Sequence, residues 1–154
     1  MPEQDFDRAK VVALLNEILE AELAGVVRYT HYSFMVFGHS RIPIVSWLRE
    51  QAGIGLTHAN EAGEIVTHFG DHPSLKIGQL LETHKHEIRD ILLESLEAET
   101  EGLKLYRRLL GLAKDKSVFV EEYARRMIAE EELHVGEVNK MLRKPGDTGA
   151  FPLK

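Results

Sequence analysis

The chain has 154 residues, of which 44% are hydrophobic and 29% charged, so it is long enough for one globular domain with a full core. Its 25 acidic and 19 basic side chains give a net charge of -6, which disfavours unspecific binding to nucleic acid or anionic membrane and favours cations. With no cysteine in the sequence, disulfides, thiolate metal sites and thiol nucleophiles are excluded.

The sequence shows neither the pattern of a signal peptide nor a long apolar run. The first residues, Met1 to Asp5, are polar and acidic rather than basic and then apolar, and no apolar run is long enough to span a bilayer. We therefore expect a cytoplasmic protein with no membrane partner.

Two helices are predicted in the first half of the chain, because apolar residues recur there at three- and four-residue spacing. The first covers about residues 7–37, with Asp5 or Asp7 as its N-cap, and ends before the breaker run 38–43. The second covers about 43–69, with Pro43 in its first turn, and the run 70–73 closes it.

Two further helices are predicted after a polar connection. They cover about residues 83–113 and 117–143, and only three residues separate them, which indicates an antiparallel hairpin. The tail, 144–154, contains Pro145 and Gly146 and is predicted to be extended or disordered rather than a fifth helix. The whole pattern predicts a single all-α domain over 1–154, a four-helix bundle with one long crossover between its second and third helices.

The fourth predicted helix carries the most informative motif. Glu131 and His134 stand in a stripe of otherwise apolar residues, so the buried face of the helix should carry both. Buried ionised groups are costly without partners. A divalent metal held between helices is the simplest partner for them.

Each of the other three predicted helices also has an apolar stripe that is interrupted by a polar residue. The first contains Glu22, with Tyr29 two turns further on, the second contains His58, and the third contains Glu99. Taken singly, a glutamate on a long helix is usually solvated and a lone inward histidine is usually a hydrogen-bonded core residue. Their coincidence on four helices favours a metal site, and a carboxylate-rich set with two imidazoles suits iron or manganese.

With this order of residues, the chain resembles bacterioferritin, of the ferritin-like di-iron carboxylate family. The resemblance covers about residues 10–142 and includes Leu15-Asn16-Glu17, His58-Ala59-Asn60 and Glu130-Glu131-Glu132-Leu133-His134. It implies a homo-oligomeric shell that binds ferrous iron, oxidises it with dioxygen or peroxide at a di-iron centre and stores ferric mineral. The ligands implied by position, to one iron or to both, are Glu22, His58, Glu99, Glu131 and His134, with Tyr29 as a nearby aromatic residue.

The chain departs from the bacterioferritin pattern at two positions. Bacterioferritins have a second Glu-x-x-His on their second helix, and its glutamate position is Gly55 here, so a bridging carboxylate is missing and two-iron occupancy should weaken. The site could hold one metal, recruit water or hydroxide, or use Glu61, one turn from His58. The methionine that ligates haem in the family would fall at Leu56, so haem is not expected by that route.

Two other features have more than one interpretation. Gly53, Gly55 and Gly63 weaken one helix, and they indicate either a cavity beside the metal or close packing against another helix or subunit. Histidines around the crossover, His86 among them, could bind a surface metal, although solvated side chains are the simpler interpretation, and His31 has no partner at ligand spacing.

Three functions follow from these observations. The first is an iron-binding protein for storage or detoxification, with ferroxidase activity weakened by the missing glutamate. The second is a di-iron or mononuclear oxidase or peroxidase that acts on a small molecule. The third is a degenerate accessory ferritin subunit.

Overall fold

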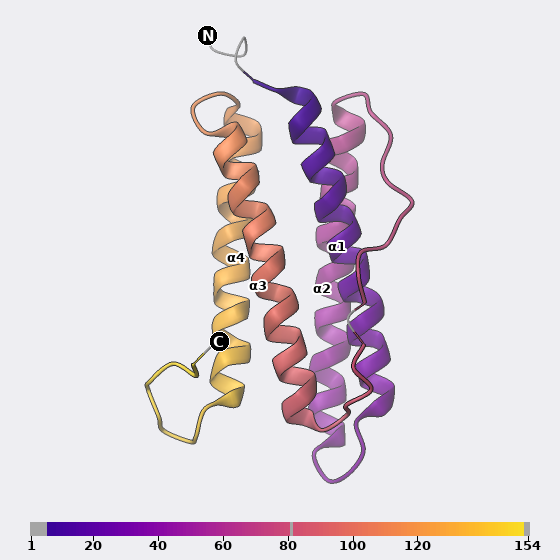
Figure 1. The fold of residues 1–154 in the computed structure, drawn as a ribbon, viewed down its shortest axis with the longest axis vertical. Helices are drawn as coiled ribbons and strands as arrows, with labels where there is room; N and C mark the ends of the chain where they lie inside the picture. Colours follow the sequence, from indigo (N-terminus) through magenta and orange to yellow (C-terminus); the bar gives the residue numbers. More distant parts are fainter. Residues whose placement is uncertain (1–5, 81, 153–154) are drawn as a thin grey trace.

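The computed structural model describes residues 6–80 and 82–152, and their regular structure is entirely helical. Four helices, α1 (Arg8–Met35), α2 (Arg41–His68), α3 (Ile88–Ala113) and α4 (Val118–Leu142), form the bundle in Figure 1. The all-α four-helix prediction is confirmed. None of the described helices is both long enough and apolar enough to cross a membrane.

Local side-chain chemistry sets the helix ends. Asp7 caps α1 by accepting a hydrogen bond from the Lys10 backbone N–H at 3.1 Å, and Ser117 caps α4 through the Val120 N–H. The alternative N-cap, Asp5, lies outside the described residues. After α2, Gly70 adopts a left-handed φ of +80°, a conformation that glycine reaches without a steric penalty.

The third helix begins at Ile88, five residues after the predicted start at Thr83, so that predicted boundary is wrong. The Glu82 side chain accepts a hydrogen bond from the His84 N–H, and Thr83 donates its N–H to Glu94 at 3.1 Å. His84 also has a φ of +58°, which an α-helix does not accommodate. Side-chain to backbone bonds therefore replace the first helical turn.

The crossover, residues 69–87, runs alongside α1 in Figure 1. The Gly78 N–H donates to the Glu20 carbonyl at 2.9 Å, and the Ser74 hydroxyl donates to the Glu20 carboxylate at 2.6 Å. A Cβ at Gly78 would lie 3.1 Å from the Glu20 carbonyl oxygen, so the close approach depends on glycine.

The described part of the tail, residues 143–152, forms no helix but folds back on the bundle. The Asn139 side chain accepts a hydrogen bond from the Phe151 N–H at 2.9 Å and donates one to its carbonyl at 3.0 Å. The Arg89 guanidinium lies 5.1 Å from the centre of the Phe151 ring. The tail is therefore held to α3 and α4 as an extended segment.

The apolar core is divided along the bundle. One cluster, which includes Leu15, Leu109 and Met127, fills one end, and a second, which includes Tyr32 and Leu48, lies towards the other end with a smaller cluster between α3 and α4 beside it. Burying each such side chain stabilises the fold by about 1.5–3 kcal/mol. Between the two ends the inward positions are polar, and this layer contains the candidate site.

Candidate metal centre

The polar layer brings together all five residues that the sequence predicts as ligands. Glu22 comes from α1, His58 from α2, Glu99 from α3, and Glu131 and His134 from α4. Backbone packing joins α1 to α2, α3 to α4 and α1 to α3, whereas α2 and α4 face each other without close backbone contact. The side chains of the polar layer extend into the space between α2 and α4.

One half of the site is formed by Glu22, His58 and Glu131. Their donor atoms lie within 4.8 Å of one another. Nδ1 of His58 is 3.3 Å from Oε1 of Glu131 and 3.5 Å from Oε1 of Glu22. His58 and Glu131 are only 5% and 4% exposed, so the cluster is closed to bulk water on most sides.

The other half is formed by Glu99 and His134, whose Oε1 and Nε2 atoms are 3.6 Å apart. The Tyr29 hydroxyl donates to Glu99 at 2.8 Å and lies 3.3 Å from Nε2 of His134. Trp47 stacks on the His134 ring, with the two planes 8° apart. Tyr29 and Trp47 therefore fix the orientation of this carboxylate and this imidazole.

Two contributors were missed from the sequence. Tyr106 donates its hydroxyl to Glu22 at 2.8 Å, which holds that carboxylate as Tyr29 holds Glu99. Glu130 places Oε2 3.0 Å from Nε2 of His58. Tyr106 follows Glu99 by two turns on the inward stripe, so helical spacing could have found it. Glu130 lies at the edge of its stripe, one turn before His134, where spacing alone does not show that its side chain turns inward.

The alternative ligand Glu61 does not line the central cavity. The Arg126 guanidinium donates to Glu61 at 2.8 Å and to Glu130 at 3.3 Å, on the surface between α2 and α4. For Glu61 to reach a metal at His58, its ion pair with Arg126 would have to break.

The site is a cavity of about 360 Å³. Gly55 lies on its wall, where an added Cβ would meet Val26 at 3.3 Å and Oε2 of Glu22 at 3.8 Å. Gly53 and Gly63 have no atom within 4 Å of a built Cβ, so they do not serve close packing within the chain. Of the three glycines, Gly55 alone contributes to the cavity.

The pKa values of the site residues show that the clustered carboxylates favour a positive charge nearby. Burial favours the neutral imidazole, yet hydrogen bonds and charge from Glu131 and Glu22 outweigh it and raise the pKa of His58 to about 11. Burial and the neighbouring carboxylates Glu99 and Glu22 raise the pKa of Glu131. Burial also opposes ionisation of Glu99, but hydrogen bonds from His134 and Glu131 lower its pKa.

The protons bound to His58 and Glu131 supply the positive charge that a divalent cation would otherwise supply. Metal binding requires ionised carboxylates and neutral imidazoles, so a cation would displace the protons on His58 and Glu131. The donor set therefore fits a hard or borderline transition metal such as iron or manganese.

Comparison with known families agrees with the geometry. The sequence matches the family profile "Ferritin-like domain" over residues 12–145. The chain belongs to the ferritin-like family. A comparison with curated protein sequences gave no match.

Three solved structures illustrate what this ferritin-like chain is similar to. A ferritin-like di-iron carboxylate protein from Bacillus anthracis str. Ames has 21% identity and a TM-score of 0.83, covering 88% of this chain and 96% of its own. Rhodobacter capsulatus bacterioferritin, described with a metal-free dinuclear site and haem iron, has 23% identity and a TM-score of 0.77, covering 87% and 84%. The dodecameric thioferritin from Bacteroides fragilis has 18% identity and a TM-score of 0.84, covering 92% and 89%. At these identities the likeness establishes the shared fold.

Proposed function

We propose that the protein binds ferrous iron at the bundle centre and serves in iron storage or detoxification, with oxidation of the iron by dioxygen or peroxide. The observation that carries the proposal is the convergence of Glu22, His58 and Glu131 within 4.8 Å, next to Glu99 and His134. The similarity to a di-iron carboxylate protein and a bacterioferritin supports iron as the cation.

Iron is the substrate in this proposal, and each ferrous ion gives up one electron to the oxidant. The protein supplies geometry and charge. Glu131 lies between the two halves of the site, where its carboxylate can serve both. Tyr29 and Tyr106 each donate to one oxygen of a carboxylate, which orients Glu99 and Glu22 towards the cavity.

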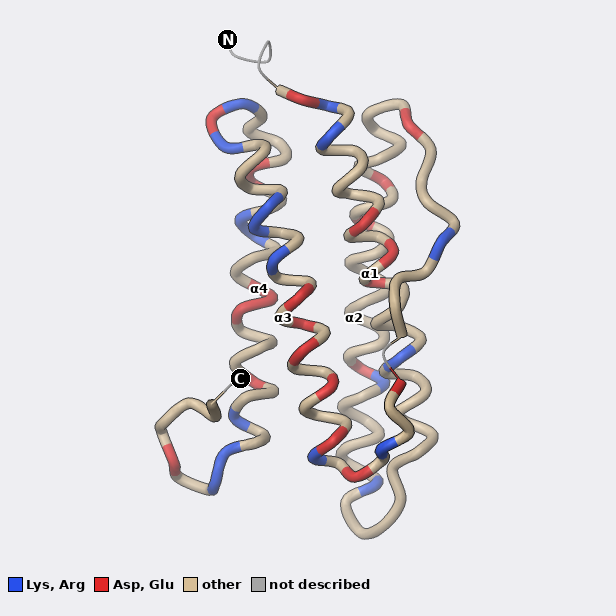
Figure 2. The backbone as a smooth tube through the Cα atoms, viewed as in Figure 1, with Lys and Arg blue, Asp and Glu red and all other residues tan. Residues whose placement is uncertain are grey.

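The distribution of acidic residues along the bundle supports entry of cations. Figure 2 shows acidic residues following one another along the middle of α3 and α4, whereas Lys and Arg gather towards the hairpin that joins these helices. The middle of this helix pair is level with the candidate site, so its field favours cations there.

We further propose that Glu130 partly replaces the carboxylate missing at Gly55. Its Oε2 atom lies 3.0 Å from Nε2 of His58, across the imidazole ring from the Nδ1 atom that faces Glu22 and Glu131. Glu130 therefore adds negative charge without reaching a metal at Nδ1, and at about 7 Å and an effective dielectric constant of about 20 one unit-charge pair is worth about 2 kcal/mol. Since Arg126 also pairs with Glu130, the compensation is incomplete, and we expect one ion to bind tightly and a second more weakly.

The test is ferrous iron oxidation by wild type, Glu131→Gln and the adjacent control Glu132→Gln. Glu131 is buried in the site, whereas Glu132 is exposed on the outer face of α4. Because changing groups that merely orient metal ligands costs 10- to 100-fold, E131Q should slow oxidation at least about tenfold, while E132Q should match wild type. Equal rates in all three proteins would refute the proposal and favour a degenerate accessory subunit.

The cavity favours a second candidate, an oxidase or peroxidase for a small molecule. Ile54, Gly55 and Leu133 give part of its wall an apolar or small lining, and its volume is about 360 Å³. An enzyme of this kind would turn over only with an organic partner, whereas a storage protein oxidises iron in its absence. Oxygen consumption with ferrous iron alone separates the two.

We also propose a homo-oligomer. Large apolar side chains are exposed on α2 and α4, with Leu56 47% and Leu133 76% exposed, and a second copy would bury them. The Bacteroides fragilis protein of the same fold is dodecameric. Native mass spectrometry of the full chain tests the proposal, and a monomer at micromolar concentration would contradict it.

A further inference from the structure

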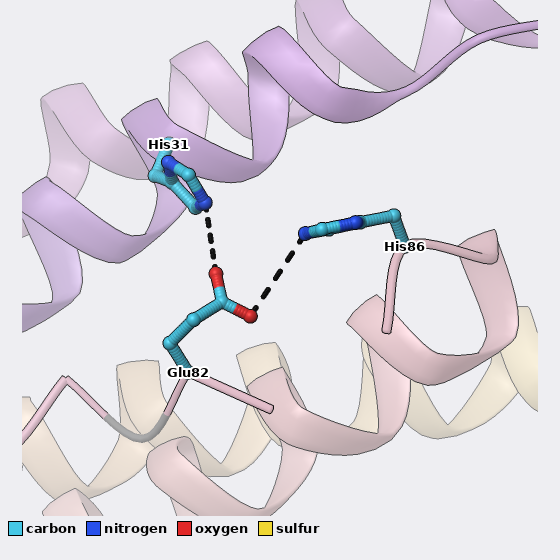
Figure 3. Close-up of side chains that lie close together, drawn as sticks. All are labelled: His31, Glu82 and His86. Atoms are coloured by element: carbon cyan, nitrogen blue, oxygen red, sulfur yellow. Dashed lines mark ion pairs between the residues drawn. The ribbon is translucent and has the colours of Figure 1, made fainter. Parts of the chain in front are cut away.

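A second group of metal-ligating side chains lies outside the central cavity, where the crossover passes α1. Figure 3 shows His31 of α1 and the crossover residues Glu82 and His86 with their donor atoms turned towards one another. Nε2 of His31 lies 2.8 Å from Oε2 of Glu82, and Nε2 of His86 lies 3.9 Å from Oε1. A metal with bonds of about 2.1 Å holds its ligand atoms about 3–3.5 Å apart, so these separations suit one shared cation.

This group is separate from the bundle centre. His31 follows Glu22 by nine residues, which on an α-helix is about 13.5 Å along the axis and half a turn around it. The two residues therefore lie on opposite faces of α1, and the two sites share no ligand.

Unpaired buried atoms provide independent evidence that something is bound here. Oε2 of Glu82 and Nε2 of His86 are buried and have no hydrogen-bond partner among the described residues, because the short contact between His31 and Glu82 lacks hydrogen-bond alignment. Two of the six such side-chain atoms in the described parts of the chain therefore belong to the proposed ligands, whereas the Tyr32 hydroxyl and the Glu94 carboxylate are close enough to pair with each other. Since buried polar atoms are normally paired, the two atoms on Glu82 and His86 indicate a ligand.

The chemistry of the three side chains selects the ligand. Burial opposes ionisation of Glu82, but the His84 backbone N–H and the nearby imidazoles lower its pKa, so the carboxylate is charged. Two imidazoles and one carboxylate form the ligand set of many zinc sites and of non-haem ferrous sites, in which water fills the remaining positions.

We propose that His31, Glu82 and His86 bind a divalent transition-metal cation, zinc or ferrous iron, at a second site that ties the crossover to α1. The proposal is independent of the function proposed for the bundle centre. The cation closes a link between positions 51 residues apart, so binding stabilises the folded crossover against local opening.

The first experiment counts bound Zn²⁺ by equilibrium dialysis and elemental analysis, and repeats the count with Fe²⁺ without oxygen. The variant H31Q/H86Q removes two ligands, and the control H39Q/H72Q removes two exposed histidines outside this group, the second of them in the crossover. H31Q/H86Q should bind one cation fewer per chain than wild type and the control. Loss of Zn²⁺, of Fe²⁺ or of both identifies the occupant, and equal counts in all three proteins with both metals would overturn the proposal.

The second experiment needs no variant. Trypsin can cleave the crossover after Lys76 and after Lys85, and only Lys85 lies between the proposed ligands Glu82 and His86. Zn²⁺ or Fe²⁺ should slow cleavage after Lys85 more than cleavage after Lys76. Equal effects at both positions, with neither metal protecting Lys85, would contradict the proposed site.

Discussion

Replacing Gly55 by glutamate tests the link between local charge and metal occupancy. The new side chain would start 3.8 Å from Oε2 of Glu22 and enter the cavity beside His58. Without metal, helix propensity gains up to about 1 kcal/mol. Repulsion from the Glu22 carboxylate at about 5 Å costs about 3 kcal/mol at an effective dielectric constant of about 20. Attraction to the protonated His58 offsets part of this cost, whereas the Cβ lies 3.3 Å from Val26, which must shift. The metal-free protein should therefore be destabilised by up to about 2 kcal/mol.

With metal present the sign reverses, because the added carboxylate attracts the second cation. We expect G55E to bind two ions per chain at the bundle centre under conditions where wild type binds one. The assays are urea unfolding of the metal-free protein and metal counting in the H31Q/H86Q background, which removes the second site.

Gly53→Glu is the matched control for this prediction. Gly53 stands two residues earlier on α2 with no atom within 4 Å of a built Cβ, so the same substitution adds a carboxylate outside the cavity. It should stabilise the metal-free protein by up to about 1 kcal/mol and leave the metal count unchanged. If G55E stabilises the metal-free protein as G53E does, or adds no metal, the electrostatic reasoning is wrong.

Three further predictions concern the hydrogen bond that Tyr29 donates to a carboxylate, the protonation of His58 and the packing of the crossover. Tyr29→Phe removes a hydrogen bond to Glu99, so the metal-free protein should lose about 1.5–3 kcal/mol in urea unfolding and oxidise iron more slowly; unchanged values would show that this bond orients nothing. The pKa of His58 is about 11 when folded and about 6.5 when unfolded, so its contribution to stability is complete below 6.5 and lost towards 11. The melting temperature of the metal-free protein should accordingly fall between about pH 7 and 10, and metal binding at pH 7 should release protons, which calorimetry in buffers of different ionisation heat detects. Gly78→Ala brings a Cβ within 3.1 Å of the Glu20 carbonyl oxygen and should cost about 1–3 kcal/mol, and a neutral result in urea unfolding would show that the crossover can move away freely.

Residues on regular helices were predictable because their neighbours follow from spacing alone. The stripes containing Glu22, His58, Glu99 and Glu131 placed all four side chains in one layer, as the structure does. The same rule extends to Glu130, which is one position from the stripe and one turn from His134, but an apolar stripe does not show which polar neighbours at its edge turn inward.

The crossover could not be predicted in the same way. The start of α3 depends on hydrogen bonds of Glu82 and Glu94 to the backbone, which compete with the helix and leave no periodic signal. The pairing of His31 with Glu82 joins positions 51 residues apart, so it arises only from the path of the crossover along α1.

Anomalous scattering at the iron edge, from crystals of the full chain soaked in ferrous salt without oxygen, tests the central proposal most directly. We predict a peak within bonding distance of Glu131 and His58 in the cavity between α2 and α4. A cavity without a peak, with iron bound solely at His31, Glu82 and His86, would contradict the proposal that the bundle centre is the iron site.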